Sequence, residues 1–456
     1  MDPEQLQSQE NAQEQTQSRQ FEAVSEELLD QALEVLYDQG GFDFVATTVE
    51  GADNMEPGAM RDVFMADEEN EDERKALKKR LESFIDLIES TENIGEMIEN
   101  SQEKGETAGT LLNSNLQRAL DATKTLEENY RTVAAFYTNA GGDDPVKNVT
   151  ILNASMEKVI DLDNRRFLEA VNDEFKNKYD RLDLMNNYSM LLIPGHMKNK
   201  QVIDEWARTA AESKVMLLTD YRNLANADQI MRLFEKDKLT GSDDFRANVM
   251  MTCNWLIGRE QYVEAGEKEP IYLPPSAALA GKLYSGNMAQ VSAGVQHGVL
   301  RGVSGTRADI RANDLAKLGD MGLIPMAFEF GQVQAMGKST LFNGTNLGMQ
   351  TYSVVRTFDW LTKCLMDFLN RKTFINISVN EEMAIQKEIS SFFSKCVKEY
   401  KFLEKYDNVT VKRDPNQKDR VNVYVHATPF FPAKNFVLRL DGKSGDSGNE
   451  YDVGME

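Results

Sequence analysis

The sequence predicts a mixed α/β fold, in which a helix-rich body is followed by a terminal β-sheet that can pair between subunits. Apolar side chains keep helical spacing over long stretches from Lys75 onward, which is typical of amphipathic helices. Two compact apolar runs, Met190–Pro194 and Val215–Thr219, flank a helical stretch around Trp206. This order is typical of a strand–helix–strand unit. Short runs that alternate between polar and apolar residues then occupy the C-terminal end.

The first part of the chain, residues 1–74, is expected to be a disordered tail that carries one helix. Residues 1–20 are rich in Gln, Ser and Glu, and such a composition cannot repay the entropy of ordering. Residues 21–39 carry an apolar stripe and are followed by two glycines, which predicts an amphipathic helix that ends there. The rest, up to the acidic run 67–73, is predicted to be a linker. A short helix on a flexible arm suits docking in a partner's groove; the alternative is that the stripe packs on the protein's own body.

Residues 75–160 are expected to form the helical and strand part at the start of the core. Apolar stripes from Leu77 to Ile88 and from Leu116 to Tyr137 predict helices whose apolar face meets a core or an interface. Val146 to Leu152 is predicted to be a strand, and Met156 to Tyr179 a helix. The remaining regions are a central α/β body (161–375), a C-terminal helix and strand meander that joins the N-terminal part (376–442), and a flexible tail (443–456).

Three alternating strands are predicted near the C-terminus: Val409–Arg413, Val421–Ala427 and Phe436–Leu440. Pro429 and Pro432 interrupt the link to the third strand, because proline cannot donate to a ladder. The meander therefore has open edges, which either pack within their own domain or add to a strand of another subunit. The residues predicted to form inter-subunit strands are Val421, Val423, Val425, Phe436, Leu438 and Leu440.

Composition argues against several functional classes. The formal net charge of −23 disfavours binding to nucleic acid or to an anionic membrane. Basic residues concentrate in the last hundred residues and the acid excess lies largely in the first hundred, which predicts head-to-tail contact between copies. Three widely spaced cysteines indicate a reducing compartment without a disulfide framework. The sequence shows neither a signal peptide nor a membrane-length apolar run, so a cytoplasmic location is expected.

Catalytic and cofactor sites are not indicated. His196, His297 and His426 lie far apart in the sequence, so neither a zinc site nor a nucleophilic triad is predicted. The sharpest alternative is a P-loop-like nucleotide-binding enzyme, since Gly331 to Thr340 resembles a phosphate-binding loop. That motif needs four residues between its glycines and a helix after it. Here five residues intervene and Gly344 ends any helix after one turn, so the sequence disfavours this alternative.

A resemblance to a known family runs through the last two hundred residues. Its segments, in order, are Tyr272–Gly281, Arg301–Val303, Leu318–Pro325, a hydrophobic helix from Gln350 to Phe374, and Pro429–Phe431. Their order and spacing resemble the large subunit of the type VI secretion contractile sheath. Between about residues 100 and 200 the chain shows few of the family's sequence features, so it resembles a divergent member.

The resemblance implies a structural protein that is not an enzyme, needs no cofactor and works in the cytoplasm. It implies co-polymerisation with a small sheath subunit around an inner tube protein, attachment to a baseplate, contraction that propels the tube, and recycling by an AAA+ unfoldase. The nearest alternative is the sheath of a phage-tail-like injection machine. The segment Glu27 to Leu33 resembles the helix by which the recycling unfoldase recognises such subunits. The docking residues that follow from this are Val24, Leu28, Leu29, Asp30, Ala32 and Leu33.

Overall fold

The computed structural model describes residues 71–89, 93–141, 146–180, 184, 187–417, 419–433, 439–443 and 450–454. The chain divides into two compact units, Met1–Thr110 and Leu111–Glu456. The described part of the first unit holds α5 (Glu71–Glu89) and the beginning of α6 (Ile94–Ala140). Both helices were predicted from apolar stripes in the sequence, and the structure confirms them. α6 follows Asn93, whose side-chain oxygen accepts a hydrogen bond from the Gly95 backbone N–H at 2.9 Å and so satisfies a free donor of the first turn.

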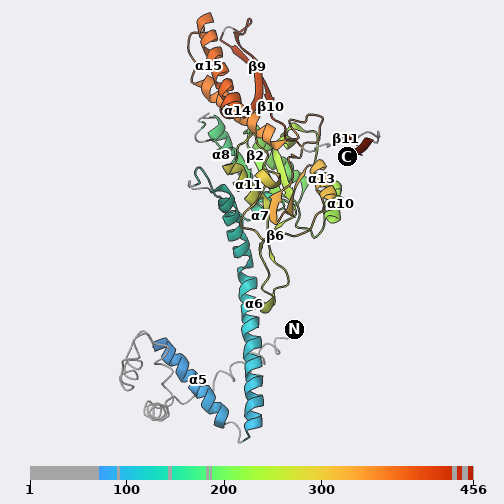
Figure 1. The fold of residues 1–456 in the computed structure, drawn as a ribbon. Helices are drawn as coiled ribbons and strands as arrows, with labels where there is room; N and C mark the ends of the chain where they lie inside the picture. Colours follow the sequence, from blue (N-terminus) through green and yellow to red (C-terminus); the bar gives the residue numbers. More distant parts are fainter. Residues whose placement is uncertain are drawn as a thin grey trace, which may run out of the picture. The chain divides into compact units, whose positions relative to one another are not determined.

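The second unit alternates strands and helices in its body and ends in a helical pair with strands (Figure 1). Its strands are β1 (Met190–Leu192), β2 (Met216–Asp220), β3 (Val249–Cys253), β4 (Leu256–Arg259), β5 (Ile271–Leu273), β6 (Gly305–Thr306), β7 (Leu323–Glu329), β8 (Gln332–Ala335), β9 (Leu403–Arg413), β10 (Val421–Pro429), β11 (Arg439–Lys443) and β12 (Glu450–Gly454). Its α-helices are α7 (Met156–Ile160), α8 (Arg166–Asp180), α9 (Lys200–Glu212), α10 (Ala227–Asp237), α11 (Pro275–Ser285), α12 (Gly294–His297), α13 (Ala312–Asp320), α14 (Tyr352–Asn370) and α15 (Val379–Lys398), and its 3₁₀ helices are η4 (Asp244–Asn248) and η5 (Val263–Ala265).

A five-stranded sheet in the order β1-β2-β3-β7-β8 forms the centre of the body. Neighbouring strands are parallel from β1 to β7, and β8 returns antiparallel to β7. The strand–helix–strand prediction is confirmed, because β1 and β2 are parallel neighbours joined through α9. β2 and β3 are buried along their whole length. Strands covered on both faces read as continuous apolar runs, which is the pattern these strands show. A smaller sheet, β5-β4-β6, is antiparallel.

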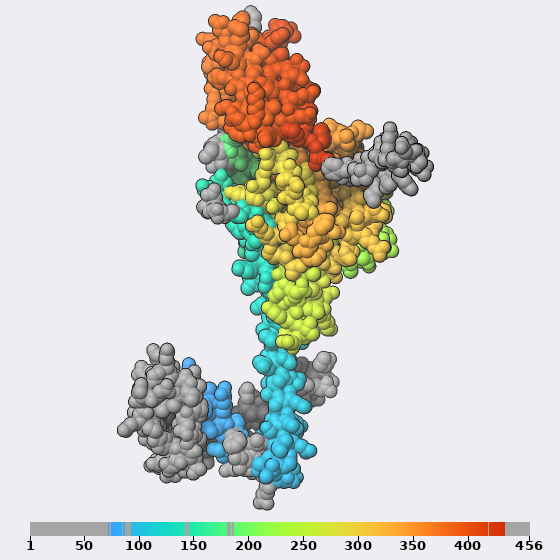
Figure 2. All heavy atoms as spheres, in the orientation of Figure 1, coloured from blue at the N-terminus to red at the C-terminus, as the bar shows by residue number. Residues whose placement is uncertain are grey.

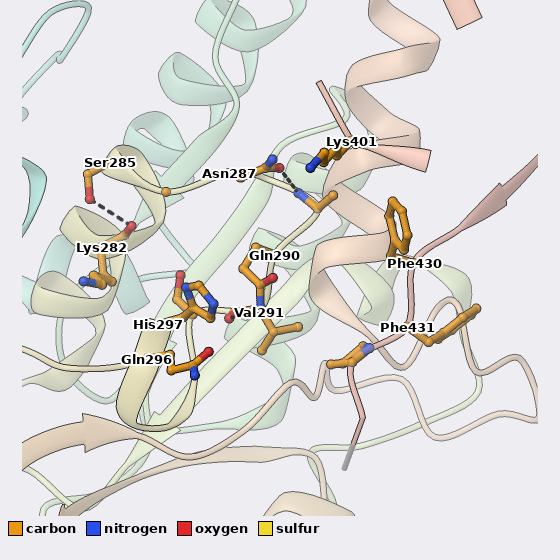
Figure 3. Close-up of a pocket in the computed structure, with 14 residues that line it drawn as sticks. Lys282, Ser285, Asn287, Gln290, Val291, Gln296, His297, Lys401, Phe430 and Phe431 are labelled. Atoms are coloured by element: carbon orange, nitrogen blue, oxygen red, sulfur yellow. Dashed lines mark hydrogen bonds between the residues drawn. The ribbon is translucent and has the colours of Figure 1, made fainter. Parts of the chain in front are cut away.

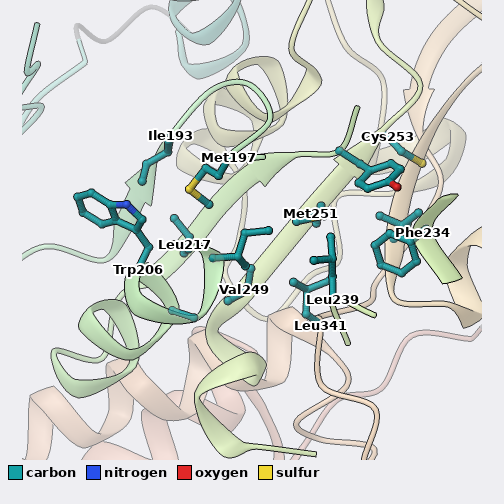
Figure 4. Packing of buried hydrophobic residues seen from close by; sticks show 14 of the residues in the cluster. Ile193, Met197, Trp206, Leu217, Phe234, Leu239, Val249, Met251, Cys253 and Leu341 are labelled. Carbon is teal, nitrogen blue, oxygen red and sulfur yellow. The ribbon is translucent and has the colours of Figure 1, made fainter. Parts of the chain in front are cut away.

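Different helices cover the two faces of the central sheet. Leu217 belongs to a core cluster with Trp206 of α9, whereas its neighbours Met216 and Leu218 belong to another cluster with Leu279 of α11. Successive side chains of a strand point to opposite faces, so α9 and α11 lie on opposite sides of the sheet. Figure 4 shows Leu217 near Trp206 in the first of these clusters.

Trp206 also connects two segments that are distant in the sequence. Its side chain is only 1% exposed, and its indole N–H donates to the carbonyl oxygen of Val159 in α7 at 2.9 Å. A buried indole needs such an acceptor, because an unpaired donor in the core is costly. The bond therefore fixes α7 against α9.

The C-terminal residues form a lobe with a core of its own, which is coloured orange to red in Figure 2. In this lobe α14 and α15 pack against the antiparallel pair of β9 and β10. The predicted helix from Gln350 to Phe374 is confirmed as α14, and the strands predicted at Val409–Arg413 and Val421–Ala427 lie within β9 and β10.

Two predictions near the start of the second unit are wrong. Residues 146–152 form no strand among the described residues. Val149, Ile151 and Leu152 are 40%, 64% and 57% exposed, and a β-prone sequence without a partner strand forms no ladder. The helix predicted from Met156 is divided into α7 and α8. Asp161 interrupts it, because its side-chain oxygen accepts from the backbone N–H groups two and three residues later, both at 3.0 Å, and this Asx turn competes with the helix.

The predicted three-stranded meander also differs from the structure. β11 pairs with β12 rather than with β10, so the described part of the terminus contains two hairpins. β12 lies within the segment that the sequence predicted to be a flexible tail. Residues 434–438 lie outside the described residues, and they include most of the predicted third strand.

Candidate assembly surfaces

One face of the C-terminal half of α6 is fixed to the body of the second unit. The Asn139 side chain is buried and exchanges two hydrogen bonds with the backbone of Arg301, at 3.0 and 2.9 Å. Gly281 of α11 lies so close that a Cβ atom there would be 2.2 Å from the carbonyl oxygen of Phe136. Only glycine permits such an approach of two helix backbones.

A charged cluster holds α6 to the body at a second point, which is closer to the N-terminal end of the helix. The guanidinium of Arg259, at the end of β4, donates to Glu127 of α6 at 2.8 Å and to Glu267 at 2.7 Å, and lies 4.1 Å from the ring centroid of Tyr262. The Arg259 side chain is only 8% exposed. Its hydrogen bonds lower the pKa of Glu267 to about 2 and lower the pKa of Glu127 as well. Ion pairs shielded in this way hold orientation better than exposed ones.

The opposite face of this helix is apolar and exposed, and we call it the α6 seam. Its six large side chains are between 40% and 71% exposed: Leu112, Leu116, Leu126, Tyr130, Val133 and Tyr137. With Ala119 and Thr123 included, the spacing alternates regularly between four and three residues, which is the heptad pattern of helices that pair with another helix. The sequence left core and interface open for this stripe, and the exposure of these side chains excludes the core of the described unit. The α6 seam is an unpartnered face within the described residues.

The pair β9 and β10 is the other candidate surface. Val421, Val423 and Val425 are half-buried against the core of the C-terminal lobe, whereas Tyr424 is 66% exposed. The alternation predicted for this strand is therefore confirmed. In the described part of the chain β10 pairs with β9 alone, and a strand with one free edge can accept a further strand.

The other residues predicted to form interfaces are placed only in part. Phe436 and Leu438 lie outside the described residues, and Leu440 is known only as a backbone position in β11, opposite Val453. β11, which contains Leu440, pairs with β12 and is not in one sheet with the valines of β10. The predicted docking helix, with Val24, Leu28, Leu29, Asp30, Ala32 and Leu33, also lies outside the described residues.

Asp220 is a buried group that sequence reasoning missed. It lies at the carboxyl end of β2, where α/β sheets commonly bind ligands. Here its carboxylate accepts from the backbone N–H of Gly195 at 2.7 Å, from the N–H and hydroxyl of Ser276 at 2.7 and 2.5 Å, and from the Thr252 hydroxyl. Burial raises its pKa, and these donors oppose the rise. An acidic residue directly after an apolar run was the signal that could have revealed it.

The Asp220 cluster is structural in character. Its four donors come from three separate places, namely the loop after β1, the strand β3 and the start of α11. They satisfy both oxygens of the carboxylate, so neither oxygen is left to act on a substrate. The side chain therefore joins the parallel sheet to α11.

The alternative of a phosphate-binding loop is excluded by the local geometry. Gly331 lies in the turn between the antiparallel strands β7 and β8, with φ +74°, and no helix follows Lys338 directly. The hydroxyls that would coordinate a metal ion in such a loop are used elsewhere, since Ser339 donates to the Gly319 carbonyl at 2.7 Å and Thr340 to the Met349 carbonyl at 2.6 Å. Successive N–H groups cannot face a phosphate here as they do in a P-loop.

The described residues offer neither a metal site nor a membrane-spanning helix. Within the described residues, no group of three or more His, Cys, Asp or Glu side chains is arranged to hold a metal ion. None of the described helices combines the length and the apolar character needed to cross a membrane.

Comparison with known proteins identifies the family. Three family models match the chain, namely a TssC/VipB-like N-terminal region over residues 29–116, the type VI secretion system TssC/VipB central domain over 118–343, and a TssC/VipB-like C-terminal domain over 351–456. A comparison with curated proteins gave no match.

Two solved structures show a weaker likeness. The anti-feeding prophage (AFP) baseplate structure has 18% identity, covers 69% of this chain and 80% of its own, and has a TM-score of 0.49. The contracted AFP helical sheath has 17% identity, covers 68% and 80%, and has a TM-score of 0.48. Both likenesses are weak, so the family models alone support the assignment. The chain belongs to the TssC/VipB family of type VI secretion sheath proteins, which are structural proteins and not enzymes.

Proposed function

We propose that this chain co-polymerises with a small sheath subunit through the α6 seam, and that the polymer surrounds an inner tube and propels it by contracting. The observation that supports this proposal is the heptad spacing of six exposed apolar side chains on a helix whose other face is already docked. An exposed apolar face of this length is typical of an interaction site. The occupant is an amphipathic helix of the small subunit, whose own apolar positions would enter the spaces between these side chains.

The test is co-expression of the chain with the small subunit, followed by co-purification and negative-stain electron microscopy. Wild-type chain is expected to give hollow tubes only when both subunits are present. The double variant Leu126→Ser, Tyr130→Ser removes two large seam residues and is expected to weaken the complex by about 2–4 kcal/mol, so that both proteins stay unassembled.

A matched control lies on the same helix. Asp121 and Lys124 are exposed but polar and lie off the seam, so Asp121→Ser, Lys124→Ser should form tubes normally. The melting temperature of each variant shows whether it is folded. Normal tubes from the folded seam variant would contradict the proposed role of the seam.

We further propose that strands near the C-terminus link neighbouring subunits, so that they stay connected while the bodies move. The valines of β10 pack in the chain's own lobe, so removing them would damage the fold. The sharper test is truncation of residues 439–456, which lie beyond that core. The truncated chain should remain soluble and should still bind the small subunit, but should form no long polymer. Long tubes of the truncated chain would reject the linking role.

The N-terminal helix predicted at residues 21–39 is proposed as the docking element for a recycling AAA+ unfoldase. Its sequence motif, Leu28-Leu29-Asp30, supports this proposal, as does the position of the motif at the end of a polar tail. Leu28→Ser with Leu29→Ser should leave tube formation intact and abolish disassembly by the unfoldase and ATP.

Attachment to a baseplate at one end of the polymer is the remaining proposed contact. A sheath of the injection-machine class would assemble without the small subunit, which the co-expression experiment measures directly.

A further inference from the structure

A pocket of about 590 Å³ lies between the segment after α11 and the end of β10 (Figure 3). Its walls include three basic residues, Lys282, His297 and Lys401, and two aromatic residues, Phe430 and Phe431. Figure 3 shows the two phenylalanine rings on one side and Lys282 with His297 on the other. A pocket of this size accommodates one or two side chains of a peptide.

The charge of this pocket is opposite to that of the chain. Acidic residues outnumber basic ones by 74 to 51 in the sequence, yet none of the lining residues is acidic. Among the described residues, Lys282, His297 and Lys401 take part in no ion pair. Two lysines without an ion pair and without nearby carboxylates favour an anionic partner.

The walls of the pocket are held in place by the body of the protein. Asn287 donates from its side chain to the Tyr400 carbonyl at 3.2 Å and accepts from the Ala289 N–H at 2.9 Å. The Ser292 N–H donates at 2.7 Å to the hydroxyl of Tyr352, which is fully buried. A site fixed by such bonds loses little freedom on binding. The apolar wall remains available, since Phe430 and Phe431 are 41% and 49% exposed.

We propose that this pocket binds residues 63–69 of a second copy of the chain. That segment reads Val63-Phe64-Met65-Ala66-Asp67-Glu68-Glu69, so three large apolar side chains and then one alanine come before three successive carboxylates. The apolar residues match the phenylalanine wall, and the carboxylates match the lysines on either side. No other stretch of residues 1–74 combines two or more adjacent large apolar side chains with three successive acids within one residue of them.

A second copy is the source that the charge distribution favours. The acid excess lies in the first hundred residues of the chain, whereas this basic pocket is lined by residues between 282 and 432. Contact between the two ends of different copies is head-to-tail, and such contacts repeat along a helical polymer. They also offset the repulsion between copies that each carry a charge of −23. The inference rests on the proposed function only in that the polymer supplies the neighbouring copy.

The first experiment measures binding of a fluorescent peptide of residues 60–73 to the full chain by fluorescence anisotropy. Saturable binding that weakens with added salt is expected. Lys282→Glu with Lys401→Glu should weaken it about tenfold or more. The control variant Lys236→Glu, Lys387→Glu makes the same charge change at exposed sites outside the pocket and should bind as wild type. Absence of binding to wild-type chain, or equal binding by both double variants, would overturn the inference.

The second experiment separates a neighbour's segment from the chain's own. Asp67→Asn, Glu68→Gln, Glu69→Gln is made in the receptor chain, which is kept dilute. If the pocket normally holds its own segment, this variant will bind the labelled peptide more tightly than wild type, and that result overturns the second-copy source. An unchanged affinity is expected. Tubes that form with the small subunit while peptide binding is absent would reject this contact and leave the proposed function intact.

Discussion

Gly281→Ala tests a close backbone approach in the body, where α11 meets α6. The new Cβ would lie 2.2 Å from the Phe136 carbonyl oxygen and 2.9 Å from the Ala140 nitrogen. Both neighbours are backbone atoms, so no side chain can rotate away. The first contact must lengthen to about 3.0 Å, which moves the two helices apart by most of an ångström and strains the paired hydrogen bonds of Asn139 to Arg301.

The expected cost follows from two opposing terms. Overpacking of this kind costs about 1–3 kcal/mol, with the upper part of the range expected here because the clash is with backbone. Replacing glycine by alanine inside a helix returns about 1 kcal/mol. We expect a net loss of about 2 kcal/mol, together with faster hydrogen exchange of the backbone amides in the last turns of α6.

The control is Gly319→Ala in α13, where the added Cβ meets nothing within 4 Å. This variant should be as stable as wild type or slightly more stable. Thermal melting and hydrogen exchange of the full chain are compared for the two variants. If Gly281→Ala melts at or above the wild-type temperature, or leaves exchange in α6 unchanged, the reasoning about this helix contact is refuted.

Three further predictions concern buried or partly buried polar groups. Asp220→Ala leaves several buried donors without an acceptor and should destabilise the body by about 3 kcal/mol or more in urea unfolding, with Asp220→Asn intermediate; equal midpoints would contradict this. The Glu267 pKa is lowered to about 2, so its pair with Arg259 should contribute stability that is fully present above pH 4.5, its ordinary value, and is lost as the pH falls towards 2. Glu267→Gln should therefore melt lower at pH 7, and a difference that persists at pH 2 would argue against this linkage. Trp206→Phe removes the indole donor to Val159 and should cost about 1–3 kcal/mol, visible as faster exchange in α7, whereas unchanged exchange there would show that the bond is unimportant.

Periodicity predicted the regular elements because burial leaves a direct trace in the sequence. The continuous apolar runs of β2 and its neighbours were found because both faces of the central sheet are covered, and α6 and α14 were found because their apolar stripes are long. The two failures have different causes. Val149, Ile151 and Leu152 suit a strand by type, yet strand formation depends on a partner strand that local sequence does not specify. The break between α7 and α8 depends on one Asx turn at Asp161.

The candidate surfaces were predictable only in part. The apolar stripe of α6 was visible, but its assignment to core or interface depends on which residues face the body. Asn139 and the close approach at Gly281 decide that question, and both act through partners more than 140 positions away in the sequence. The pocket near Phe430 gathers its basic residues from three separate segments, so the concentration of basic residues in the last hundred positions did not predict it.

The sequence by itself determined the α/β class, the order of its main elements, the absence of a complete phosphate-binding motif and the resemblance to a sheath subunit. These follow from local spacing, from composition and from short motifs. Only the tertiary structure decided that the heptad face of α6 is exposed, that β11 pairs with β12, that Asp220 joins the sheet to α11, and that two lysines meet two phenylalanines in one pocket. The physical reason is that exposure, pairing and charge clustering depend on contacts between distant segments, which a linear pattern of residues does not encode.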